Sequence, residues 1–133
     1  MKESGFIPAI LKNECPRCRK GKLFRSNNPY DLKRVLDMHD ACPVCNQRTE
    51  LEIGFWYGTG YVSYVLAVTL SVINLTWYWL IFGITWKDNS IFHWLIVNSI
   101  ILTLSMPFLL RLSRTLYLSF YVSYDPTAER RMK

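Results

Sequence analysis

The chain has 133 residues, a formal net charge of +6, four cysteines and 50% hydrophobic residues. Two uncharged runs, 61–85 and 91–110, occupy much of that length and leave roughly sixty N-terminal residues for a water-facing domain. A domain of that size has too little chain for a large core and often depends on a metal ion or on disulfides. The chain offers no Ser/His/Asp or Cys/His catalytic set, phosphate-binding glycine loop or paired-carboxylate site. We therefore expect a protein that is not an enzyme.

Residues 1–53 are expected to form a cytoplasmic metal-binding ribbon, because they carry two Cys-Pro-x-Cys knuckles. Cys15 and Cys18 form the first knuckle, and Cys42 and Cys45 form the second. Two residues between cysteines let both thiolates reach one tetrahedral ion, and two such turns complete a four-sulfur site. Such a site has no open position for a substrate, so the sequence predicts structural Zn²⁺. Metal binding would supply folding free energy on the order of 10 kcal/mol or more.

Other interpretations of the cysteines stay open at this point. A cytoplasmic location disfavours disulfides. A redox dithiol also uses Cys-Pro-x-Cys, although two matched knuckles fit a shared metal better. Iron in a rubredoxin-like cage suits the same four sulfur ligands. His39, three residues before Cys42, is a weaker candidate that could replace one cysteine.

Two short strands are expected in this domain. Lys22–Arg25 leaves the first knuckle, and the alternating residues 50–53 suit an edge strand. A residue that tolerates positive φ is useful just after each knuckle, where Asn46 and Gly21 are the candidates. The basic residues between the knuckles suit a nearby membrane surface better than a nucleic acid.

Residues 54–60 form an aromatic and glycine-rich junction. Tryptophan and tyrosine favour the membrane–water interface, so an aromatic belt explains Trp56 and Tyr57. The density of aromatic and small residues, Phe55 included, also suits a surface for a protein partner. Gly54 and Gly58 would permit close helix contact if this stretch is helical.

The runs 61–85 and 91–110 are each long enough to cross a hydrocarbon core about 30 Å thick. A soluble helix needs a polar face, and neither run offers a charged one. We therefore predict a mainly α membrane protein, in which residues 86–90 are the external loop of a two-helix transmembrane hairpin. Ten Lys/Arg precede the first run, five follow the second and one, Lys87, lies between them. This distribution predicts a multi-pass inner-membrane protein with both termini in the cytoplasm.

Polar residues within the runs indicate helix packing rather than a transport path. Asn74 and Thr103 lie at similar depth, so we expect a hydrogen bond between the helices there. The runs contain no charged residue for an ion relay. Pro107 is expected to kink the second helix.

Residues 111–133 are predicted to form an interfacial helix extension followed by a basic tail. Arg111 and Arg114 share a helical face and can reach lipid phosphates or the acidic edge of the metal domain. The apolar stretch 116–124 is too short to span, so it either covers the ribbon or lies along the interface.

Several of these features together resemble one bacterial family. They are the CPRCRKGKLF start, the second Cys-Pro-x-Cys, the GFWYGTGYVSY junction and the two apolar runs. They are similar to the domain-of-unknown-function family nine-eight-three over about Cys15 to Asp125. Asn46 departs from the pattern, since a glycine is usual after the last cysteine. The resemblance implies no established activity, but it implies an association with haem–copper cytochrome oxidases, because family members look to be encoded among their assembly genes.

The sequence thus predicts a non-enzymatic inner-membrane accessory or assembly protein that binds partner membrane proteins. Respiratory cytochrome oxidase biogenesis is the setting that the resemblance implies, with an oxidase or its assembly factors as partners beside the lipid bilayer. The alternative is a membrane-tethered factor that exchanges metal or electrons at the four cysteines. A homo-oligomer stays open, and nucleic acid is disfavoured as a partner.

Overall fold

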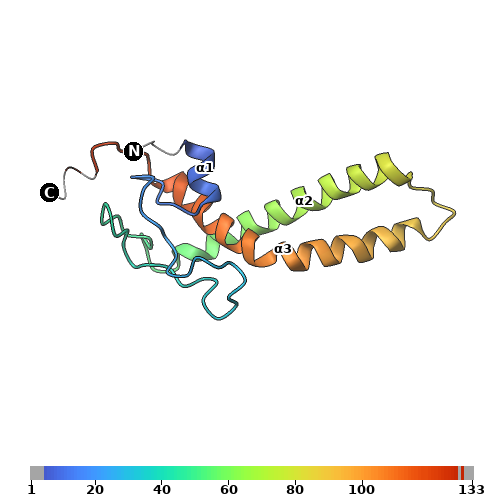
Figure 1. The fold of residues 1–133 in the computed structure, drawn as a ribbon, viewed down its shortest axis with the longest axis horizontal. Coiled ribbons are helices and arrows are strands. Elements are labelled where there is room, and N and C mark those ends of the chain that lie inside the picture. Colours follow the sequence, from blue (N-terminus) through green and yellow to red (C-terminus); the bar gives the residue numbers. More distant parts are fainter. Residues whose placement is uncertain (1–4, 129, 131–133) are drawn as a thin grey trace.

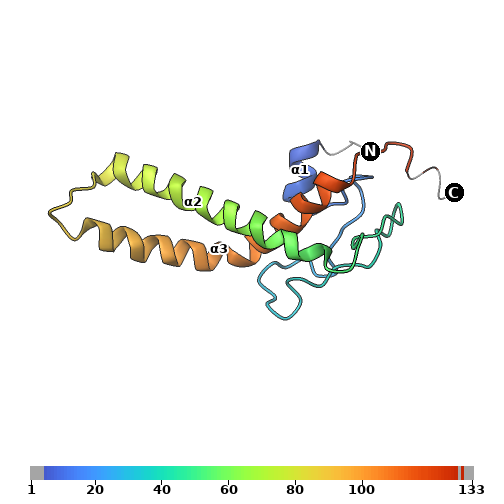
Figure 2. The same cartoon turned by 180° about the vertical axis from the view of Figure 1, so that it is seen from behind.

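The computed structural model describes residues 5–128 and 130. Along the chain it has α1 (Phe6–Leu11), the 3-10 turn η1 (Phe55–Gly58), α2 (Thr59–Phe82) and α3 (Ser90–Tyr121). Helices α2 and α3 lie side by side as an antiparallel pair (Figure 1). The pair projects from a globular end that contains α1, the long loops and the end of α3. Figure 2 shows the same arrangement from behind, with the connecting loop at the far end of the pair.

Both long helices follow the uncharged runs, although their ends differ from the predicted ones. Helix α2 ends at Phe82, before the predicted Thr85, because Gly83 adopts a left-handed φ of 66°. Helix α3 continues well beyond Leu110. Pro107 lies inside it, and Figure 1 shows α3 changing direction as it enters the globular end.

A small polar network joins the two helices in the half of the pair that lies nearer the connecting loop. The Asn74 side-chain amide donates to Asn98 Oδ1 at 3.2 Å, and that of Asn98 donates to Ser71 Oγ at 3.3 Å. The predicted bond between Asn74 and Thr103 is wrong. The hydroxyl of Thr103 instead donates at 2.8 Å to the Ser99 carbonyl one turn back on its own helix, as threonines in helices often do.

Two helices of the described chain are long and apolar enough to cross a membrane. None of the most apolar stretch of the first is buried inside the molecule, and only 22% of that of the second is. A core helix of a soluble protein hides its apolar side chains within the fold. These helices keep theirs outside, for example Trp77 and Ile81 of α2.

The globular end is mainly loop. Residues 5–128 and 130 contain no strand, so the strands predicted at Lys22–Arg25 and 50–53 are wrong. Three isolated antiparallel bridges stand in their place, between Glu14 and Lys22, Phe24 and Met38, and Ala41 and Arg48. The alternation of acidic and apolar residues at 50–53 does not correspond to a buried face, because Leu51 and Ile53 are both exposed. The domain is therefore organised by its side chains rather than by a sheet.

Candidate metal centre

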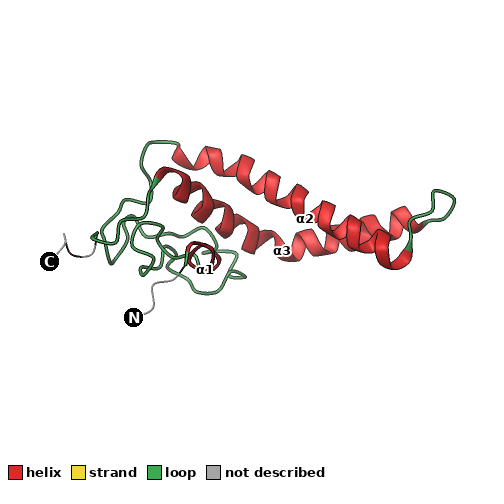
Figure 3. Cartoon of the chain, turned by 90° about the horizontal axis from the view of Figure 1, so that it is seen from above, coloured by secondary structure: helices red, strands yellow, loops and turns green. Residues whose placement is uncertain are grey.

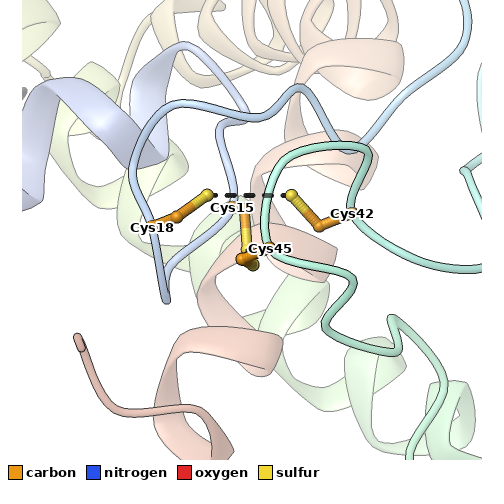
Figure 4. Close-up of side chains that lie close together, drawn as sticks. All are labelled: Cys15, Cys18, Cys42 and Cys45. Atoms are coloured by element: carbon orange, nitrogen blue, oxygen red, sulfur yellow. Dashed lines mark hydrogen bonds between the residues drawn. The ribbon is translucent and has the colours of Figure 1, made fainter. Parts of the chain in front are cut away.

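The four predicted cysteines come together at the centre of the globular end. Their sulfur atoms all lie within 4.8 Å of one another, and all four residues are buried. Cys15 Sγ lies 3.8 Å from Cys45 Sγ, and Cys18 Sγ lies 3.7 Å from Cys42 Sγ. Figure 4 shows the side chains converging from two loops, each loop supplying one knuckle. The cysteines can therefore bind one metal ion.

The spacing of the sulfur atoms fits a tetrahedral metal better than disulfides. A disulfide requires sulfurs about 2.05 Å apart, far less than either measured separation. Zinc–thiolate bonds of about 2.3 Å place the corners of a regular tetrahedron about 3.8 Å apart. The two short separations, 3.7 and 3.8 Å, match that edge. Iron coordinated by four thiolates would need a similar arrangement.

The two knuckles repeat one backbone design. The N–H of Arg19 donates to the Cys15 carbonyl, and the N–H of Asn46 donates to the Cys42 carbonyl, each at 2.8 Å. Arg19 and Asn46 have φ values of 52° and 54°, a conformation that turns the chain tightly after the second cysteine. The counterpart of Asn46 is therefore Arg19, and the sequence-based assignment of that place to Gly21 is wrong.

Gly21 is required for space. A Cβ atom on this residue would collide with Cys42 Sγ and would lie 3.3 Å from Val44 Cγ2. Its carbonyl also accepts a 2.7 Å hydrogen bond from the Cys15 N–H, which closes the first knuckle. The absence of a side chain thus lets the first loop pass directly against the second cysteine pair.

Burial and the contacts between the cysteines shift the pKa values of the thiols in different directions. Burial raises the pKa of Cys45 to about 11. Hydrogen bonding with Cys18 and Cys42 raises the pKa of Cys15, whereas the contact with Cys15 lowers the pKa of Cys18. A metal ion binds thiolates, so its binding at this cluster would release thiol protons.

The end of α3 and the segment after it cover the cluster. Leu118 is fully buried, and Val122 and Ala128 complete the same core. Asp125 binds the first knuckle, since its N–H donates to the Arg17 carbonyl and its carboxylate lies 3.7 Å from the Arg17 guanidinium. These contacts tie the second long helix to the cysteine loops.

Comparisons with protein-family models, curated proteins and solved structures find no match for this chain. Its interpretation rests on its own residues, and the family resemblance stays a prediction.

Arg111 has a structural role that the sequence does not indicate. It is 2% exposed, and its guanidinium donates to the carbonyls of Val35, Ser26 and Asn28 at 3.0, 2.8 and 2.9 Å. The same group lies 4.9 Å from the centre of the Phe24 ring. Three of its N–H bonds are thus directed into the loop between the knuckles. Its side chain is thus held inside the globular end rather than extended toward lipid phosphates.

Arg114, one turn later, is half-buried. It donates to the Leu36 carbonyl at 3.1 Å and lies 4.8 Å from the centre of the Trp56 ring. With Trp56 it lines an open polar groove of about 480 Å³, whose walls include Asp40 and Glu50. Arg114 therefore lies in the same groove as acidic residues of the cysteine loops, and its predicted contact with that edge stays a prediction.

The junction aromatics divide between the core and the surface. Phe55 is buried, with its ring centre 4.9 Å from that of Tyr117 and 5.3 Å from that of Tyr121. Trp56 is partly buried, whereas Tyr57 is 87% exposed. Tyr57 is thus the junction aromatic that most resembles a free surface residue.

His39 is not part of the cysteine group. Its carbonyl accepts a 2.6 Å hydrogen bond from the Thr49 hydroxyl, and the residue lines the groove beside Arg114. The four thiols form a complete ligand set without it.

Proposed function

We propose that this chain is a non-enzymatic membrane accessory protein that is built around one structural Zn²⁺ ion. The observation that carries this proposal is the buried cluster of four cysteine sulfurs at tetrahedral spacing. Cys15, Cys18, Cys42 and Cys45 would hold the ion, which supplies a cross-link between the two loops. Four protein ligands fill a tetrahedral site, so no position remains for a substrate or water.

The long helices support a transmembrane hairpin. Their apolar side chains face outward, where only hydrocarbon or apolar partner helices would stabilise them. The cysteine loops, α1 and the segment after α3 lie together at one end, so one side of the membrane would hold all of them (Figure 3). The excess of Lys and Arg in these segments favours the cytoplasmic side of the inner membrane.

In this proposal the ion fixes the position of α3 relative to the loops. The cysteine core includes Leu118 and Val122, and Arg111 clamps the loop between the knuckles. The result is a rigid cytoplasmic platform joined directly to a membrane helix. Such a platform suits docking onto another membrane protein better than exchange of metal or electrons, because the thiols are buried.

The partner that we propose is another membrane protein, contacted by the outer faces of the hairpin and by exposed junction residues such as Tyr57. The resemblance favours a respiratory oxidase or one of its assembly factors. Isolation of the tagged chain from native membranes in mild detergent, followed by mass spectrometry of co-purifying proteins, tests this. Stoichiometric recovery of one membrane protein by the wild type, and its loss with Cys15→Ser/Cys45→Ser, is the expected result.

Two controls sharpen that experiment. Zinc content is measured on the same samples, so that loss of partner can be compared with loss of metal. Lys87→Gln, at the far end of the hairpin, serves as a variant that should leave both unchanged. Recovery of the fully extracted wild-type protein alone would overturn the accessory role, whereas rapid exchange of the bound zinc with free metal would favour the metal-handling alternative.

A further inference from the structure

A groove beside the middle of α3 is lined by apolar and basic side chains. Its volume is about 370 Å³, and Leu11 and Phe108 supply apolar surface while Lys12 and Lys22 supply charge. Leu11 is 51% exposed and Phe108 is 37% exposed, so packing within the chain leaves part of each side chain accessible. A second, smaller recess adjoins it and shares both lysines.

The groove lies at the boundary of the apolar part of α3. Phe108 belongs to the uncharged run that ends at Leu110, whereas Lys12 directly follows α1 and Lys22 comes from the first cysteine loop. If the hairpin crosses a bilayer as proposed above, Phe108 faces acyl chains. The headgroup layer is about 5–7 Å thick, which is the distance that four to five helical residues beyond Leu110 would cover. Thr115 lies at that height, and its hydroxyl donates to Asn13 Oδ1 at 3.0 Å, beside Lys12.

Helix α1 has the orientation of an element lying on a membrane surface. It runs across the long axis of the hairpin in Figure 1 and is seen end-on in Figure 3. Ala9 and Ile10 are buried, whereas Phe6 and Ile7 are 55% and 68% exposed. Leu11, the last residue of this helix, lines the groove, and the chain leads from it into the first knuckle.

The charges around the groove favour an anion. Lys12, Lys22 and the guanidinium of Arg111 contribute three positive charges, and Glu14 contributes one negative charge. Arg111 uses its N–H groups on backbone carbonyls, so it adds field rather than a free donor. The Lys22 ammonium donates a hydrogen bond to Asn27 Oδ1 at 2.9 Å, and both Lys22 and Lys12 are exposed. Both ammonium groups can turn toward a phosphate.

We propose that this groove binds the phosphate headgroup of an anionic phospholipid, with Lys12 and Lys22 on the phosphate and Leu11 and Phe108 against the upper acyl chain. The occupant is a lipid of the bilayer that holds the hairpin, so this inference rests on the proposed transmembrane function. Binding there seats the first knuckle at a fixed height above the hydrocarbon. The anionic leaflet thereby orients the cysteine platform.

Native mass spectrometry of the purified full chain in detergent tests the site, with phosphatidylglycerol and phosphatidylcholine as the added lipids. We expect the wild type to retain phosphatidylglycerol in preference. Each lysine near an anionic surface contributes about fivefold to affinity, so Lys12→Gln/Lys22→Gln should weaken phosphatidylglycerol binding about 30-fold. The control Arg48→Gln/Lys87→Gln removes the same charge elsewhere and should retain the preference. Zinc content reports whether each variant is folded.

Equal retention of both lipids by the wild type, or equal losses in the two double variants, would overturn the lipid site. Displacement of phosphatidylglycerol by millimolar inorganic phosphate would overturn it in favour of a site for soluble anions. Resistance of the membrane-bound protein to alkaline extraction is measured separately. Release by alkali would overturn the transmembrane hairpin, and the lipid site with it, whereas retention with no lipid preference would overturn the lipid site alone.

Discussion

At the far end of the molecule, α2 and α3 meet through side chains and a few hydrogen bonds, whereas at the other end four cysteines and one arginine organise loops that contain no described strand. The helices satisfy their own backbone polar groups, so they require only an apolar surrounding. The loops satisfy theirs through turns, isolated bridges and the guanidinium of Arg111. The two regions should therefore respond to different perturbations.

Loss of the cysteine cluster should separate the two regions most clearly. In Cys15→Ser/Cys45→Ser, or after chelation, we expect the globular end to lose its fold, because the ion supplies on the order of 10 kcal/mol in comparable sites. Helices α2 and α3 should persist in detergent. Hydrogen exchange would show lost protection within residues 13–49, with protection of 62–80 retained. Simultaneous loss of both regions would contradict this division.

Replacement of Arg111 is the next largest expected effect. Arg111→Met leaves three carbonyls without their donor, and hydrogen bonds to charged groups contribute about 1.5–3 kcal/mol each, so we expect a loss of about 3 kcal/mol or more at the globular end. Arg114→Met is the matched control, since Arg114 reaches one carbonyl and is partly exposed. Chemical denaturation followed by zinc release measures both variants. Equal effects would show that burial of Arg111 is unimportant.

Gly21→Ala tests the close approach of the two knuckles. The added methyl group would meet Cys42 Sγ, and overpacking of this kind costs about 1–3 kcal/mol, so zinc affinity should fall about 5- to 150-fold. Gly60→Ala, where no neighbouring atom lies within 4 Å of the added carbon, should bind zinc as the wild type does. Competition with a chromogenic chelator measures the affinities. Unchanged affinity in the Gly21 variant would be inconsistent with the proposed packing.

The smallest effect is expected in the hairpin itself. Asn98→Leu removes hydrogen bonds to Asn74 and Ser71, and interhelical bonds of this kind contribute about 0.6–2 kcal/mol. Thr103→Val removes only a bond within α3 and should change little. Steric-trap or denaturant unfolding in detergent compares the two. A larger loss in the Thr103 variant would restore the pairing first expected from the sequence.

The sequence was sufficient for features that depend on local pattern. Uncharged runs of sufficient length predicted both long helices, and Cys-Pro-x-Cys spacing predicted the four residues that meet at the candidate metal site. Both signals need only the residue types and their separations.

The errors concern contacts between distant segments and the local geometry of the knuckles. Arg111 directly follows an apolar run, so the sequence predicts an interfacial residue. Nothing in the sequence indicates that its guanidinium donates to three carbonyls of a loop 76–85 residues earlier in the chain. The strand expected at 50–53 relied on alternation without knowledge of which face is buried. Arg19 adopts a positive φ because the turn of the knuckle requires it. That requirement outweighs the unfavourable energy of a positive φ for an arginine.

The central claim is that four cysteines hold one structural zinc ion between the two loops. Elemental analysis combined with zinc-edge X-ray absorption on the full chain, purified from cells grown without added metal, tests it most directly. The predicted result is one zinc per chain, coordinated by four sulfur atoms at about 2.3 Å. Folded protein that is free of metal, or zinc coordinated by fewer than four sulfurs, would contradict it.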